Sequence, residues 1–143
     1  PPIKLSEVYS NLGTAYYVMK KYNEALRSYE TMINIYSVNF ITNYIYMADC
    51  QNRLGLERSI PIIDEDKYIN APDDIKIMYK YFLLSKDIPV FVKQNYIMKK
   101  VLPNLVDSEL IDIFKFELNN LVKISNHYKL LHLFNEYINE KKS

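Results

Sequence analysis

The stretch YSNLGTAYYVMKKYNEALRSY, residues 9–29, decides the fold of this chain. In its first half, large apolar side chains recur at the i, i+3, i+7 and i+10 spacing of one helical face: Tyr9, Leu12, Tyr16 and Met19. In its second half, Ala25 and Tyr29 lie four residues apart and therefore share one face of a second helix. The polar pair Lys20-Lys21 separates the halves, so the pattern predicts two antiparallel helices joined by a short turn.

We expect these helices over residues 5–20 and 23–36, with Asn23 as the N-cap of the second. Gly13 lies inside the first helix, where glycine costs about 1 kcal/mol relative to alanine. A cost of that size indicates a structural reason, and the usual one is the close approach of a neighbouring backbone. The small residues would let the two helices interlock.

The order and spacing of seven residues resembles the tetratricopeptide (TPR) repeat, a helix–turn–helix unit of about 34 residues: Tyr9, Leu12, Gly13, Tyr16, Tyr22, Ala25 and Tyr29. The resemblance implies an all-α chain whose antiparallel helix pairs stack as a short right-handed superhelix. It also implies a scaffold that binds peptides or proteins.

The repeat weakens along the chain. A clear repeat covers about 6–39, a weaker one about 40–73, and divergent helix pairs fill 74–143. In the weaker repeat a turn falls at Leu54-Gly55-Leu56, and a helix is expected to open at Ser59 or Ile60 with Pro61 in its first turn. We expect one continuous helical domain over 1–143, as a fragment of a longer protein.

The later helices are expected at 74–86, 89–102, 108–125 and 127–141. The polar stretch 64–74 separates the first of these from the weaker repeat, and an aspartate at its end is a natural N-cap. Ser108 follows the break at Pro103-Asn104 and is a second expected N-cap.

Composition limits the function. Apolar residues make up 49% and charged residues 24% of the 143 residues, and the formal net charge is +1. Such a chain has no general attraction to nucleic acid or to an anionic membrane, and no apolar run is long enough to span one. The single cysteine, Cys50, excludes an internal disulfide and fits the cytoplasm.

No residue pattern predicts catalysis, a cofactor or a metal. His127 and His132 are five residues apart rather than the four that would place two ligands on one helical face. The acidic run at 64–66 fits a solvated helix end. With only two glycines, the chain cannot build a phosphate-binding loop. We therefore expect a binding protein rather than an enzyme.

Fourteen tyrosines exceed what a core of this size needs, and tyrosine suits peptide recognition. In a TPR-like superhelix the first helix of each pair lines a concave groove. The register then predicts seven groove residues that contact a ligand: Thr14, Tyr17, Tyr44, Gln51, Asn52, Lys76 and Lys80. The alternative, that they are ordinary solvated side chains, stays open.

The chain is rich in asparagine and combines one clear repeat with several decayed ones. In these features it is similar to the C-terminal regions of peptide-pheromone receptors of Gram-positive bacteria, of the Rap, Rgg and PlcR kind. That similarity implies the sensing domain of a transcriptional regulator, which binds a short signalling peptide and can form a homodimer. The DNA-binding part would then lie upstream. The alternative is a scaffold or dimerisation module without a small ligand, which docks a larger protein through apolar residues such as Phe134 and Tyr137.

Overall fold

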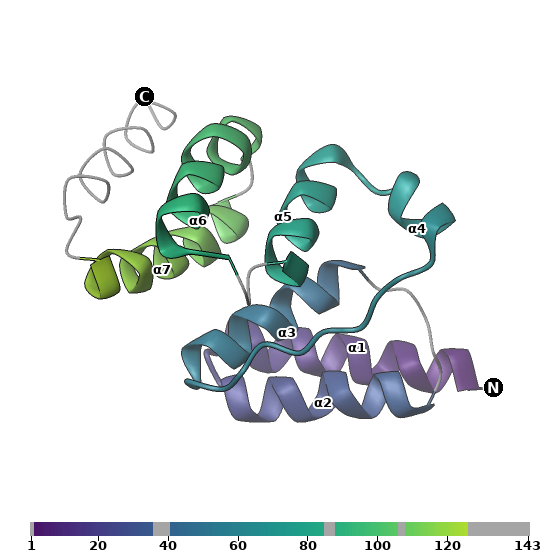
Figure 1. Ribbon diagram of the computed structural model, residues 1–143. Coiled ribbons are helices and arrows are strands. Elements are labelled where there is room, and N and C mark those ends of the chain that lie inside the picture. Colours follow the sequence, from purple (N-terminus) through teal and green to yellow (C-terminus); the bar gives the residue numbers. More distant parts are fainter. Residues whose placement is uncertain (1, 36–40, 85–87, 106–107, 126–143) are drawn as a thin grey trace. The chain divides into compact units, whose positions relative to one another are not determined.

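The computed structural model describes residues 2–35, 41–84, 88–105 and 108–125 (Figure 1). Every regular element within these ranges is helical, which confirms the all-α prediction. The chain divides into two compact units, Pro1–Lys86 and Asp87–Ser143. Among the described helices, none is long and apolar enough to cross a membrane.

The first unit begins with the predicted hairpin. Helix α1 covers Pro2–Val18 and α2 covers Tyr22–Ile35, and the two lie side by side along their length (Figure 1). The prediction of Asn23 as an N-cap is wrong. Helix α2 starts one residue earlier, and the Ala25 N–H donates to the Lys21 carbonyl at 2.9 Å, so Asn23 lies inside the first turn.

Both turns that follow a first helix close in the same way. Lys20, with a φ of 62°, and Gly55, with a φ of 70°, adopt the left-handed conformation. The next residue then donates its N–H back into the last helical turn, from Lys21 to the Tyr16 carbonyl and from Leu56 to the Gln51 carbonyl. This is the Schellman ending of a helix, and it confirms the turn predicted at Gly55.

The second helix of the weaker repeat is absent. After α3 (Ile41–Arg53), residues 56–64 form no regular structure, and only the five-residue α4 (Glu65–Ile69) precedes α5 (Asp73–Leu84). The expected helix opening at Ser59 or Ile60 is therefore wrong. Proline disfavours the helical conformation of the residue before it, here Ile60, and side chains of α3 and α5 take up backbone groups of this segment.

The core of the first unit lies between α1, α2, α3 and α5. Its members are fully enclosed and come from the last three of these helices: Ala25, Tyr29, Met32, Ile45, Ala48, Cys50 and Met78. Gly13 of α1 faces Tyr29, and an added Cβ at Gly13 would lie 2.6 Å from the ring. The predicted close approach is thus confirmed, although the neighbour is an aromatic ring rather than a backbone.

One face of α1 remains open. Leu5, Val8 and Leu12 share this face, and Met19 follows directly after the helix with its N–H still bonded to the Ala15 carbonyl; the exposed fractions of the four side chains run from 39% to 57%. We call these four residues the α1 open face. The apolar stripe that predicts the helix thus lies partly outside the core, because α1 packs on α2 and α3 through its small and polar residues instead.

The second unit consists of α6 and α7. Helix α6 (Val90–Tyr96) continues into the π-helical turn η2 (Ile97–Val101) and the 3-10 turn η3 (Leu102–Asn104), and it packs against α7 (Ser108–Ser125). These bounds agree with the helices expected at 89–102 and 108–125. The helix expected at 127–141 lies outside the described residues.

Candidate functional site

Two of the predicted ligand contacts on α1 serve the packing of the protein itself. Tyr17 stacks on Tyr46 with ring centroids 4.7 Å apart, and its hydroxyl donates to the Asp49 carboxylate. The Thr14 hydroxyl forms a hydrogen bond of 3.0 Å with the Tyr29 hydroxyl. The face of α1 that was expected to line a groove therefore packs on α2 and α3.

Two predicted contacts on α3 lie in the core. Tyr44 is 2% exposed and Gln51 is 5% exposed. Their expected exposure is not found, because the segment after α3 folds back across Gln51 instead of forming a helix. The Gln51 amide donates to the Ser59 carbonyl and accepts from the Ser59 N–H, both at 2.9 Å. Gln51 is thus a clamp on the protein's own backbone.

The other three predicted contacts do not form a cluster with these. Asn52 is half-buried on α3, and the Lys76 ammonium lies 3.6 Å from the Asp73 carboxylate on the same helix. Lys80 is exposed on α5 and lines a cavity. Of the seven predicted contacts, Lys80 lines the cavity that the described residues form between residues 62–65, α4 and α5.

A buried charge joins the first helix pair to α3. The Asp49 carboxylate accepts from the Tyr17 hydroxyl and, at 2.9 Å, from the Arg53 guanidinium. Burial raises the pKa of Tyr17 well above its ordinary value, and the negative charge of Asp49 raises it further. Burial alone would lower the pKa of Arg53, but the attraction of Asp49 outweighs it. The Arg53 guanidinium also lies 5.1 Å from the Tyr22 ring centre.

Tyr17, Asp49 and Arg53 are bonded to one another inside the fold. Their arrangement joins helices and does not resemble a catalytic site. The nearby Cys50 thiol is fully buried, and burial raises its pKa to about 12. A thiol that stays protonated at neutral pH is a poor nucleophile. Within the described residues, no group of three side chains is placed to hold a metal ion, and His127 and His132 fall outside those residues.

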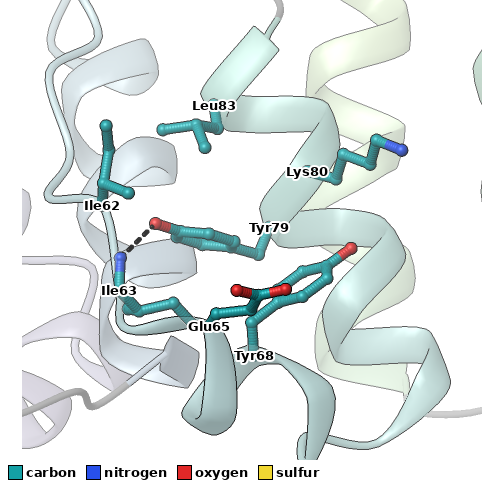
Figure 2. A pocket seen from close by; sticks show the side chains of 7 residues that line it. All are labelled: Ile62, Ile63, Glu65, Tyr68, Tyr79, Lys80 and Leu83. Atoms are coloured by element: carbon teal, nitrogen blue, oxygen red, sulfur yellow. Dashed lines mark hydrogen bonds between the residues drawn. The ribbon is translucent and has the colours of Figure 1, made fainter.

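An open cavity of about 330 Å³ lies between residues 62–65, α4 and α5 (Figure 2). Its lining is mainly apolar and aromatic, with two charged side chains: Ile62, Ile63, Glu65, Tyr68, Tyr79, Lys80 and Leu83. The volume falls at the lower end of the range of small-ligand pockets. We call this cavity the Tyr79 pocket.

Tyr79 lies between the pocket and the backbone of residues 61–63. Its hydroxyl donates to the Pro61 carbonyl at 2.5 Å and accepts from the Ile63 N–H at 3.1 Å. The pKa of Tyr79 is raised, chiefly because burial disfavours the phenolate. Tyr68 of α4 lies across the pocket, with its ring centroid 6.3 Å from that of Tyr79.

The charged side chains sit at the edge of the Tyr79 pocket. Glu65 and Tyr68 are three residues apart and lie on the α4 side, whereas the Lys80 ammonium points away from the other labelled side chains (Figure 2). Both Glu65 and Lys80 are exposed, and no ion pair joins them in the described part of the chain. Both charges therefore remain accessible to a ligand at the edge.

The segment beside the pocket, residues 56–64, is fixed at three points. The Arg58 guanidinium lies 5.3 Å from the Phe82 ring centre and 5.9 Å from that of Tyr81. Gln51 holds Ser59, and Tyr79 holds the backbone on either side of Ile62. Ile62 itself is 81% exposed. A fixed backbone with an exposed isoleucine beside a cavity is the candidate binding site of this unit.

Sequence reasoning missed this site because it assigned residues 59–63 to a helix. Two signals point to it. Glu65 with Tyr68, and Tyr79 with Leu83, have the i, i+3 and i, i+4 spacings that place each pair on one helical face. Pro61 between isoleucines fits an extended segment better than a helix.

In comparisons with known proteins, no family model, no curated protein and no solved structure matches this chain.

Proposed function

We propose that this chain is a non-catalytic peptide-binding module whose ligand enters the Tyr79 pocket. The helix pairs stack as a short TPR-like right-handed superhelix, and the module works in the cytoplasm as the sensing domain of a bacterial transcriptional regulator. The ligand is a short signalling peptide. This proposal keeps the peptide ligand that the sequence analysis expects. It moves the binding site from the concave groove to the edge formed by residues 56–64, α4 and α5.

The observation that supports it is the Tyr79 pocket itself. A cavity of about 330 Å³ with apolar and aromatic walls suits an apolar side chain, and Glu65 and Lys80 at its edge suit the polar backbone of a peptide. Ile62 exposes most of its surface beside the opening, and burying such a side chain contributes about 1.5–3 kcal/mol. The hairpin of α1 and α2, interlocked at Gly13 and Tyr29, supports the TPR-like stacking.

The test is a screen of acetylated and amidated hexapeptides with Leu, Ile, Val or Phe at alternating positions, read by fluorescence polarisation. We expect members that bind with micromolar affinity, about −8 kcal/mol. Ile62→Glu should weaken binding at least tenfold. The matched control is Leu56→Glu, since Leu56 is 52% exposed in the same segment but does not line the pocket.

Equal loss in both variants, or no binding by any library member, would contradict the proposed pocket. The regulatory part is tested separately by sequencing the gene upstream of the Pro1 codon. A helix–turn–helix domain in the same frame is the expected result. Further helix pairs or a start codon at that place would leave the peptide site intact but remove the role in transcription.

The second candidate function, a dimerisation module, is favoured by the α1 open face. Its residues recur at the i, i+3, i+7 and i+14 spacing of a coiled-coil seam, with no charge among them. The positions are also symmetric about Leu12, because Leu5 and Met19 each lie seven residues from it. In an antiparallel pair of α1 helices, Leu5 would meet Met19 of the second copy and Leu12 would meet its own equivalent, as a two-fold interface requires.

Sedimentation equilibrium tests this candidate. We expect the mass to rise toward that of a dimer with concentration, and Leu12→Glu to keep the chain monomeric. Leu56→Glu is again the control, because Leu56 lies outside the α1 open face. A monomer at every concentration would contradict the dimer. The residues first expected to dock a partner, Phe134 and Tyr137, lie outside the described residues.

A further inference from the structure

We infer that the backbone of Ile60 and Ile62 is an open edge along which an extended peptide pairs, as an added strand, while one of its side chains enters the Tyr79 pocket. The inference rests on the proposed function, because it names how the peptide of that function is held. It assigns the affinity to main-chain hydrogen bonds and the specificity to the pocket.

The first step is the direction of the backbone groups in residues 59–63. Every bonded group of this stretch belongs to an odd-numbered residue and is held by α3 or α5. Ser59 bonds through its N–H and its carbonyl to Gln51, and the Pro61 carbonyl and the Ile63 N–H bond to the Tyr79 hydroxyl. Bonded groups on every second residue are the alternation of an extended chain, in which the backbone groups of successive residues point to opposite sides.

The second step concerns the even-numbered residues. The N–H and carbonyl groups of Ile60 and Ile62 make no hydrogen bond within the described part of the chain. By the alternation they point away from α3 and α5. They are therefore placed like the outward groups of an edge strand, which can bond to an incoming extended chain.

Proline usually interrupts the hydrogen bonding of such an edge, because it has no backbone N–H to donate. Here Pro61 belongs to the odd-numbered set, so its missing N–H falls on the side that faces α5. The outward row at Ile60 and Ile62 is uninterrupted. The three anchors at Arg58, Ser59 and Tyr79 also order the segment in advance, so a peptide would lose little affinity to ordering it.

The third step is the position of the Tyr79 pocket. Ile62 contributes its side chain to the pocket and its backbone to the open edge. A peptide that pairs with Ile62 would thus hold its own residues within reach of the cavity. Since side chains alternate along an extended peptide, every second one faces the same way, and one apolar residue can fill the cavity.

The experiment uses the tightest hexapeptide from the alternating library, resynthesised with a single N-methyl group at each backbone nitrogen in turn. Each methyl removes one donor and blocks one side of the peptide. We expect methylation at positions of one parity to weaken binding about tenfold or more, and at the other parity less than about twofold. A uniform profile would overturn the inference while leaving the peptide-binding function in place.

Amide hydrogen exchange on the protein gives an independent readout. On adding the unmethylated hexapeptide, exchange should slow at Ile60 and Ile62, whereas Ser59 and Ile63, already bonded within the fold, should change little. Slowing confined to the backbone amides of α4 and α5, with none at Ile60 and Ile62, would contradict strand pairing. If no hexapeptide in the library binds, the proposed function and this inference fail together.

Discussion

At the scale of single residues, the contact between Gly13 and Tyr29 sets how closely α1 and α2 approach. Tyr29 is completely buried, and its Cε1 atom would lie 2.6 Å from a Cβ at Gly13. Glycine inside a helix is otherwise unfavourable by about 1 kcal/mol. The close packing of the ring therefore has to outweigh that cost.

We predict that Gly13→Ala lowers the free energy of unfolding by about 1–3 kcal/mol, although alanine is the better helix former. Urea denaturation measures the change. Ala15→Leu is the control, because Ala15 is exposed on the same helix and the added atoms meet solvent. If Tyr29→Leu is combined with Gly13→Ala, the two losses should not add, since the smaller side chain makes room for the Cβ. An unchanged stability of Gly13→Ala would refute the tight contact.

At the scale of elements, residues 56–64 show how side chains replace a missing helix. A helix would have bonded the backbone of this segment internally. Instead Gln51 of α3 and Tyr79 of α5 supply hydrogen-bonding groups to Ser59, Pro61 and Ile63. The segment is therefore ordered by its neighbours, and the Tyr79 pocket exists only while those neighbours hold it.

We predict that Gln51→Ala destabilises the chain by about 1–3 kcal/mol, because it leaves the Ser59 backbone without its two bonds. Amide exchange at Ser59 should accelerate more than exchange at Ala25 in α2. Gln51→Glu separates the two bonds, because a carboxylate can still accept from the Ser59 N–H but cannot donate to the Ser59 carbonyl. Thr31→Ala serves as the control, because Thr31 is half-buried and its hydroxyl bonds to the Arg27 carbonyl of the same helix. Exchange at Ser59 as slow as in the unaltered protein would contradict the clamp.

At the scale of the whole molecule, buried phenols and one buried thiol link stability to alkaline pH. Burial raises the pKa of Cys50 to about 12 and raises those of Tyr17, Tyr29, Tyr44 and Tyr79 above their ordinary value. The unfolded chain releases these protons at the ordinary values, near 9 for the thiol and 10 for the phenols, whereas the folded chain keeps them. The folded state thus binds more protons in that range, and stability falls as pH rises.

The predicted result is a constant contribution from these groups below about pH 8 and a declining free energy of unfolding above about pH 9. Urea denaturation at several pH values between 8 and 11 measures it. Cys50→Ala should reduce the decline by up to about 1.4 kcal/mol per pH unit between 9 and 11, because one titrating group is removed. A flat profile across this range would contradict the burial of these groups.

The hairpin was predictable because its signals are local. The sizes and spacing of Gly13, Ala25 and Tyr29 indicate close packing. Helices α5 and α7 follow the expected ranges within a few residues, and so does α6 when its continuation through η2 and η3 is included. The turn at Gly55 was predictable for the same reason, since glycine adopts the left-handed conformation of a helix ending at little cost. Periodicity and turn chemistry act over a few residues, so one sequence reveals them.

The prediction of ligand-contacting residues was wrong where the position of a side chain depended on partners far away in the sequence. Tyr17 and Gln51 look like groove residues in isolation, yet Asp49 and Ser59 take up their polar groups. No local pattern says whether Tyr79 will meet Pro61, eighteen residues earlier.

The sequence by itself determined that this chain is all-α and begins with an interlocked helical hairpin, because helix period and residue size are local properties. The tertiary structure alone decided that residues 56–64 form no helix, that the apolar stripe of α1 lies partly open, and that a pocket forms beside Ile62. Each of these depends on contacts between residues far apart in the sequence, such as those of Gln51 and Tyr79 with the backbone of residues 59–63 and of Tyr17 with Asp49, and such contacts form only between segments that the fold has brought together.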